Sequence, residues 1–143
     1  MNNTNCLYDK DIYAWSLDQV SHLKNKEINM LDWDHLIEEI ESLGRSAKHA
    51  LKSHLKNLLM HKLKIQYQPK KHTKSWDTSI GNAKIEIEDE LNDNPSLQHE
   101  LNEIFNNSYK SARKKAAIET GIDIKKFPQD CPWTIEEILG EGK

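Results

Sequence analysis

Apolar side chains recur every three or four residues along most of this 143-residue chain, which is the spacing of one face of an α-helix. The pattern predicts helices over residues 8–23, 32–43, 46–65, 75–91 and 95–120, and a one-turn helix through Leu139. No stretch shows the strict alternation of apolar and polar residues that is typical of a half-buried strand. We therefore predict an all-α fold, a single-domain bundle of about five helices with an apolar C-terminal tail and a short terminal helix.

Capping residues, glycines and prolines mark the expected starts and ends of these helices. Gly44 is expected to end the second helix and Gly121 the fifth, because glycine most easily adopts the left-handed C-cap conformation. Pro69 is expected to end the third, because proline cannot donate a backbone hydrogen bond. Gly81 interrupts the fourth helix and suggests a close backbone approach. The helix starts are expected at N-caps Asp32, Ser46, Ser75 and Asn94 and, in a capping box with Glu137, at Thr134.

The length suits one compact domain, which we place at residues 8–139 between disordered ends at 1–7 and 140–143. The N-terminus lacks the features of a signal peptide, and no run is long and apolar enough to cross a bilayer. We therefore expect a cytoplasmic protein that does not contact membranes. Cys6 and Cys131 lack Cys-x-x-Cys spacing and are expected to be free thiols, although a disulfide between the two tails stays open.

Charge is distributed unevenly. The segment Ser42–Trp76 contains nine Lys or Arg, four His and no acid, whereas the remaining residues carry 11 bases and 23 acids. The formal net charge of -3 therefore hides a basic segment inside an acidic remainder, an asymmetry that points to partners.

This basic segment predicts binding of a polyanion, such as a nucleic acid, or of an acidic protein. Lysines spaced by four would form one helix face, and Tyr67 and Trp76 could stack on unpaired bases. The alternative is a solvated face that balances the acidic helices, and Trp76 is also a candidate for the core. The predicted polyanion-binding residues are Arg45, Lys48, Lys52, Lys56, Lys70, Lys71 and Lys74.

A second hypothesis places chemistry between the predicted second and third helices. If these helices packed antiparallel, Glu41 would meet His61, with Glu38 and His54 nearby, and Lys64 is a further candidate. A carboxylate and an imidazole could hold a metal ion or shuttle a proton. The alternative is that His61 is a structural histidine satisfied by Glu41, Tyr109 or a backbone carbonyl. The Glu-x-x-His and His-Glu-x-x-His motifs are absent from the sequence, so we assign no catalytic residue, metal or cofactor.

One set of residues stands in an order and spacing typical of a known family: Trp33, the run 38–45, His61, Leu63, Lys64, Tyr67, Gln68, Pro69, Ser75, Trp76, Ile80, Pro95, Ser96, Leu97, Tyr109, Ala112, Arg113, Phe127, Pro128, Cys131 and Pro132. In these residues the chain resembles a bacterial family catalogued as domain of unknown function number twenty-nine. The resemblance implies a small all-helical fold and no known activity, so it transfers no catalytic residue. Lys62 and Ile65 depart from the family pattern, in which leucine and an aromatic are commoner.

Taken together, these features favour a non-enzymatic helical binding module that engages a polyanion or an acidic protein through residues 45–74. Two alternatives stay open: a metal-assisted hydrolase with a Glu/His site, and a protein-protein partner in a two-gene system. The glycine-rich loops and serine motifs of nucleotide-binding and acyl-transfer enzymes are absent from the sequence. The oligomeric state is not predicted.

Overall fold

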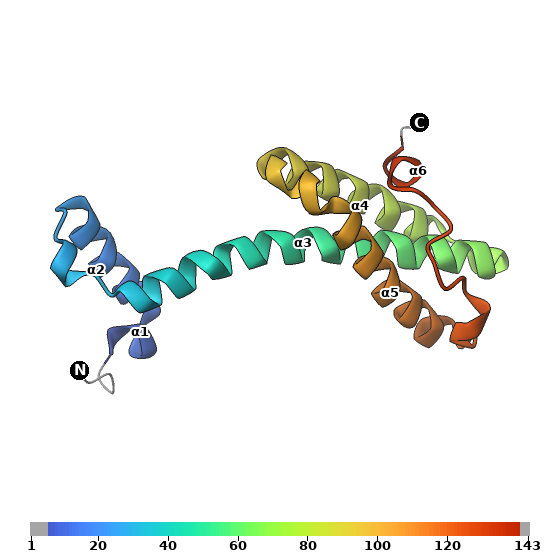
Figure 1. Ribbon diagram of the computed structural model, residues 1–143. Helices are drawn as coiled ribbons and strands as arrows, with labels where there is room; N and C mark the ends of the chain where they lie inside the picture. The colour runs from blue at the N-terminus through green and yellow to red at the C-terminus, as the bar shows by residue number, and fades with distance from the viewer. Residues whose placement is uncertain (1–5, 141–143) are drawn as a thin grey trace. The chain divides into compact units, whose positions relative to one another are not determined.

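The computed structural model describes residues 6–140, and these residues confirm the all-α class (Figure 1). No strand is present among them. No helix in residues 6–140 combines the length and apolar character needed to cross a membrane. The helices are α1 (Leu7–Lys10), α2 (Ile12–Lys24), α3 (Trp33–Tyr67), α4 (Lys74–Asp93), α5 (Leu101–Thr120) and α6 (Ile135–Leu139), with 3-10 helices η2 (Ile28–Met30), η3 (Pro69–Lys71), η4 (Pro95–Glu100) and η5 (Ile124–Lys126).

The chain divides into two compact units, unit 1 (Met1–Arg45) and unit 2 (Ser46–Lys143). Helix α3 begins in unit 1 and ends in unit 2. The predicted domain limits, residues 8–139, stay a prediction. Of the ends expected to be disordered, residues 1–5 and 141–143 lie outside the described residues, whereas Leu7 begins α1 and Gly140 caps α6.

Unit 2 is organised around one face of α3. Its fully buried side chains pack with apolar residues of α4 and α5, which lie beside it in Figure 1. The segment after α5 closes this core: Phe127 is 1% exposed, its ring lies 4.8 Å from that of Tyr67 between centroids, and Tyr109 Oη donates to the Pro128 carbonyl at 2.6 Å. The expected packing of the apolar tail is thus confirmed. The buried leucines of α3 are Leu51, Leu55, Leu58, Leu59 and Leu63.

Unit 1 has a small interior. Trp15 and Gln19 on α2 are buried, as is Leu31 in the connection to α3. Asp32 joins them, because its carboxylate accepts from Trp15 Nε1 at 2.9 Å and its backbone N-H donates to Gln19 Oε1 at 2.8 Å. These two hydrogen bonds fix the start of α3 against the middle of α2.

Several predicted helix ends are wrong. Gly44 does not end a helix: α3 runs through it without a break for 35 residues, because an interior glycine only weakens a helix unless it adopts the left-handed conformation. Ser46 is therefore not an N-cap. The first predicted helix is divided at Asp11, which caps α2 by accepting from Ala14 N. Thr73, not Ser75, caps α4.

Other predicted ends have mixed outcomes. The side chain of Asn94 makes no capping bond, and η4 precedes α5. Gly121 ends α5 at φ 76°, as expected for a left-handed C-cap. The capping box of Thr134 and Glu137 is present at α6.

The close backbone approach expected at Gly81 is absent, since a Cβ built there would meet no atom within 4 Å. We predict that Gly81→Ala raises the free energy of unfolding by about 0.5–1 kcal/mol, because alanine reduces the conformational entropy that α4 loses on folding. Urea denaturation measures this change.

The matched control is Gly121→Ala, where the positive φ should make the same added methyl group cost about 1–2 kcal/mol. Destabilisation by Gly81→Ala would contradict this account, because it would show that the added methyl group meets another part of the chain at this position.

Candidate functional site

The predicted Glu/His site between two antiparallel helices is not formed. Glu41 and His61 lie on successive parts of the single helix α3, so the expected seam does not exist. His61 Nδ1 instead lies 2.9 Å from the carbonyl of Asn57, one turn earlier, which agrees with the structural alternative. Glu38 is exposed and His54 half-buried, and neither has a described contact with the other candidates.

Lys64 has a structural environment. Its Nζ lies 2.9 Å from Glu119 Oε1 on α5 and 4.7 Å from the ring centroid of Trp76 on α4, and its side chain is only 12% exposed. The hydrogen bond from Lys64 lowers the pKa of Glu119. Lys64 therefore links three helices of unit 2 and is not free to bind a ligand.

Lysines from α3 and α5 converge on the surface of unit 2. A hollow of about 400 Å³ is lined by Lys56 of α3 and by Lys114, Lys115 and one acid, Glu119, of α5. Lys114 also lines a second hollow of about 420 Å³, together with Lys110, Arg113, Gln129 and one acid, Asp130. We call Lys52, Lys56, Lys110, Lys114 and Lys115 the basic face.

The cations of the basic face lack acidic partners. Within residues 6–140, no carboxylate lies within ion-pair distance of any of its five lysines, and Glu119, which lines the first hollow, pairs with Lys64. The Ser108 hydroxyl, completely buried, contacts the Lys52 carbonyl at 3.2 Å and ties this part of α3 to α5. The ammonium groups of these lysines therefore form no ion pair, on two helices that pack against each other.

The predicted polyanion-binding residues divide into separate groups. Lys48 is paired with Glu100 at 2.8 Å, and Arg45 is the last residue of unit 1. Lys70 and Lys71 lie exposed in η3, and Lys74 opens α4. Only Lys52 and Lys56 belong to the basic face.

The sequence interpretation missed the lysines of α5. Their signal was present, since Lys110, Arg113 and Lys114 have the spacing of one helix face. These residues were counted within the acidic remainder of the chain, and the proximity of α5 to Lys56 depends on tertiary packing.

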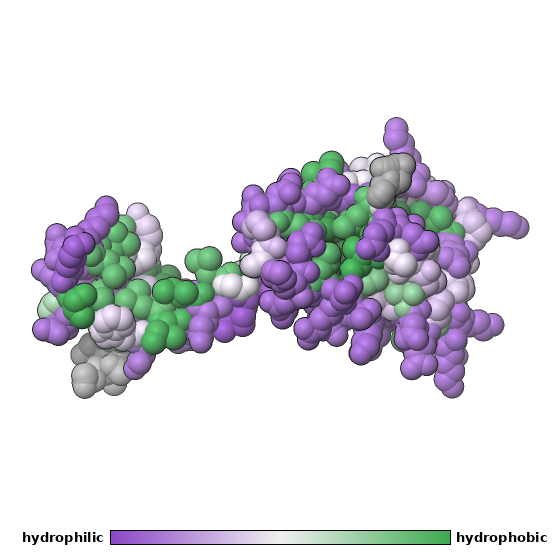
Figure 2. Space-filling view, turned by 45° about the horizontal axis from the view of Figure 1, so that its top comes forward, coloured by the Kyte–Doolittle hydropathy of each residue, from purple (hydrophilic) through white to green (hydrophobic). Residues whose placement is uncertain are grey.

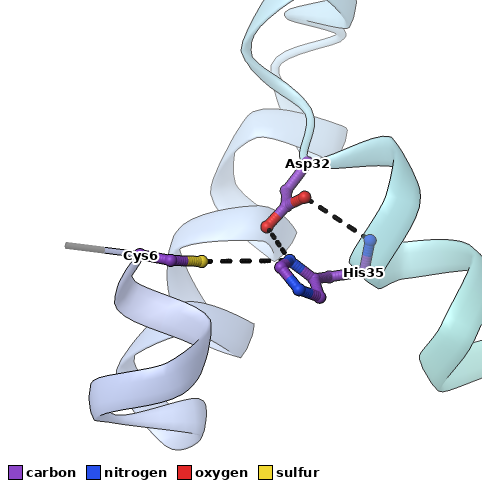
Figure 3. Close-up of side chains that lie close together, drawn as sticks. All are labelled: Cys6, Asp32 and His35. Carbon is purple, nitrogen blue, oxygen red and sulfur yellow. Dashed lines mark hydrogen bonds and ion pairs between the residues drawn. The ribbon is translucent and has the colours of Figure 1, made fainter. Parts of the chain in front are cut away.

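A second cluster lies in unit 1, where Cys6, Asp32 and His35 come together (Figure 3). His35 Nδ1 lies 2.8 Å from Asp32 Oδ2 and 3.9 Å from Cys6 Sγ. Tyr8 stacks on the imidazole with ring centroids 3.9 Å apart, and its hydroxyl donates to Glu39. The cluster joins α1, the residue before it and the first turn of α3.

Hydrogen bonding determines the charges in this cluster. The bond to Asp32 is the main cause that raises the pKa of His35 above its ordinary 6.5. Burial acts to raise the pKa of Asp32, but hydrogen bonds from His35 and Trp15 outweigh it, and the result is below the ordinary 3.8. The pair is therefore an imidazolium and a carboxylate between those two pH values.

This charge state limits the chemistry of the cluster. An ionised carboxylate only accepts hydrogen bonds, so Nδ1 carries the proton that points toward Asp32. The same nitrogen is then unable to take a proton from Cys6, as activation of a thiol would require. The three ligand atoms suit Zn²⁺ by type, but an ion would have to replace the proton between Nδ1 and Oδ2. We therefore interpret the cluster as a structural network.

Sequence reasoning did not identify this cluster. Asp32 and His35 are three residues apart, a spacing that allows their side chains to meet on a helix. In the sequence, however, Asp32 was interpreted only as an N-cap. Cys6 is 29 residues from His35, and no spacing in the sequence indicates their contact.

Comparison with known proteins places the chain in a family. Residues 7–142 match the model of the family described as Domain of unknown function DUF29. The chain belongs to this family, as its resemblance indicated, and the match covers both units. No curated protein and no solved structure matches the chain.

The His35 pair predicts a specific dependence on pH. Because the pKa of His35 is raised, its stabilising contribution is complete below pH 6.5 and is lost as pH rises through the raised value. Because the pKa of Asp32 is lowered, its contribution is complete above pH 3.8 and is lost as pH falls through the lowered value. We predict that Asp32→Asn lowers the pKa of His35, measured by NMR titration of the imidazole.

His22 is the internal control for this titration, since the pKa of its imidazole is raised mainly by Glu27 and should not change in Asp32→Asn. An unchanged His35 pKa in the variant would contradict the network.

Proposed function

We propose that the protein is a non-enzymatic binding module that holds the phosphate backbone of a nucleic acid on the basic face of unit 2. The observation that carries this proposal is the convergence of Lys56, Lys114 and Lys115 on one hollow without acids paired to them. Phosphate groups bind such cations and release condensed counterions, which makes binding favourable at low salt.

The arrangement of paired and unpaired lysines supports this surface over others. Lys48 and Lys64 have carboxylate partners at 2.8 and 2.9 Å, so a phosphate would have to compete with an existing ion pair. The lysines of the basic face, half-buried on α3 and exposed on α5, have no such competitor among residues 6–140. The best site on unit 2 therefore lies on α3 and α5, not along the whole basic segment.

The aromatic residues favour contact with the backbone over contact with bases. The Trp76 ring is covered by Lys64 and stacks with His72 at 6.2 Å between centroids, and Tyr67 packs on Phe127. Stacking platforms for unpaired bases must be accessible, so these rings are poor candidates. We therefore expect a duplex to bind at least as well as a single strand, with little preference for sequence.

The test is a titration of labelled duplex and single-stranded DNA and RNA, read by fluorescence anisotropy at several salt concentrations. For a duplex, log K should fall with log salt by about 0.9 for each phosphate contacted. The triple variant Lys56→Gln, Lys114→Gln, Lys115→Gln should weaken binding and reduce this slope by about 0.9 for each lost contact.

A matched control removes the same charge from another part of unit 2, by Lys70→Gln, Lys71→Gln and Lys74→Gln. This variant should retain most of the affinity and slope. An equal loss in both variants would exclude the basic face as a specific site. An absence of binding at the lowest salt would exclude nucleic acid and direct attention to acidic proteins.

A further inference from the structure

Unit 1 exposes most of its apolar side chains. Of the fourteen large hydrophobic side chains that are exposed among residues 6–140, twelve belong to unit 1. Figure 2 shows this hydrophobic surface over α2 and the first turns of α3. Soluble monomers rarely leave a contiguous apolar patch larger than a few hundred Å² uncovered. The exposure therefore indicates a surface that another molecule covers.

The exposed side chains form two matching stripes. On α2 and on the first part of α3, four large apolar residues follow one another at spacings of four, three and three. Such positions lie within about 120° around a helix, and no charged residue interrupts either stripe. The α2 stripe is Tyr13, Leu17, Val20 and Leu23, and the α3 stripe is Trp33, Ile37, Ile40 and Leu43, with exposed fractions of 44–73%.

We propose that these two stripes are a homodimer interface, in which α2 and the start of α3 pack against the same elements of a second copy. Two helices with apolar stripes of matching spacing and length form half of a four-helix bundle, and a second copy supplies the other half. Spacings of three and four are those that interdigitate between bundled helices. A two-fold axis then makes one surface complementary to itself.

The exposed area of the two stripes is large enough for a stable homodimer interface. The eight side chains expose on the order of 1,000 Å² per copy, which exceeds the roughly 800 Å² per partner of a stable interface. The stripes include one Trp and one Tyr, residue types that dominate the energy of interfaces. A dimer would bury this area without requiring any unit 2 residue.

Charge opposes the approach of two copies at long range but does not interrupt the apolar face where the stripes would pair. Unit 1 contains nine acids and four bases, so two copies repel one another at long range. On α3 the acids Asp34, Glu38 and Glu41 directly follow the first three stripe residues and lie outside the apolar face. The dimer should therefore hold or tighten as salt screens the repulsion, in contrast to binding of nucleic acid. This inference does not depend on the proposed function of unit 2.

Sedimentation equilibrium over a range of protein concentrations tests the dimer. The wild-type protein should be dimeric, and the double variant Leu17→Glu, Ile40→Glu should raise the dissociation constant about 100-fold or more, because it buries two carboxylates per copy at the interface. Helix content by circular dichroism should not change, since both side chains are more than half exposed.

Two further variants distinguish a specific interface from general apolar association. Ile85→Glu replaces an isoleucine of unit 2 that is also more than half exposed and should leave the dimer intact. Ile40→Ser removes apolar area without adding charge and should weaken the dimer less than the double variant. A monomeric wild-type protein at all concentrations would overturn the proposal, as would a dimer that persists in the double variant or loosens with added salt.

Discussion

Burial of one face of α3 is the constraint on which unit 2 depends. Five leucines between Leu51 and Leu63 are completely buried, and α4, α5 and the C-terminal tail all pack on them. The α5 lysines lie near Lys56 because this packing sets α5 beside α3, with the Ser108 hydroxyl closing the interface. The basic face is thus a consequence of the core: two helices that share apolar faces bring adjacent cationic positions together.

The two units differ in what they leave at the surface. Among residues 46–140, unit 2 leaves only two large apolar side chains exposed and has unpaired lysines, whereas unit 1 buries little beyond Trp15, Gln19 and Leu31 and leaves its apolar stripes exposed. Its polar contacts instead organise the inside of the unit, where Asp32 joins Trp15, Gln19 and His35. Unpaired lysines favour a nucleic acid, whereas exposed apolar side chains favour a second copy of the chain. Because the two surfaces belong to different units, these partners need not compete.

Local signals in the sequence predicted the helical class, the Gly121 end and the capping box at α6. The helix end predicted at Gly44 was wrong, because a glycine forms a left-handed C-cap only when it adopts a positive φ. The residues around Gly44 do not reveal whether it does. The predicted Glu41–His61 site required a helix end at Gly44, so it is not formed in the continuous helix α3. The Cys6–His35 contact joins residues 29 apart, and the approach of Lys114 to Lys56 depends on the core. No local spacing reports either contact. The helical pattern revealed the stripes of unit 1, although their exposure required the structure.

The central claim is that charge left unpaired on α3 and α5 binds a phosphate backbone. Acetylation of lysines with and without duplex DNA, mapped by mass spectrometry, tests it most directly because the wild-type protein reports each side chain separately. The account predicts that bound DNA protects Lys52, Lys56, Lys114 and Lys115, while Lys24 and Lys26 of unit 1 and Lys70 and Lys71 of η3 react as before. Uniform protection, or protection confined to η3, would contradict it.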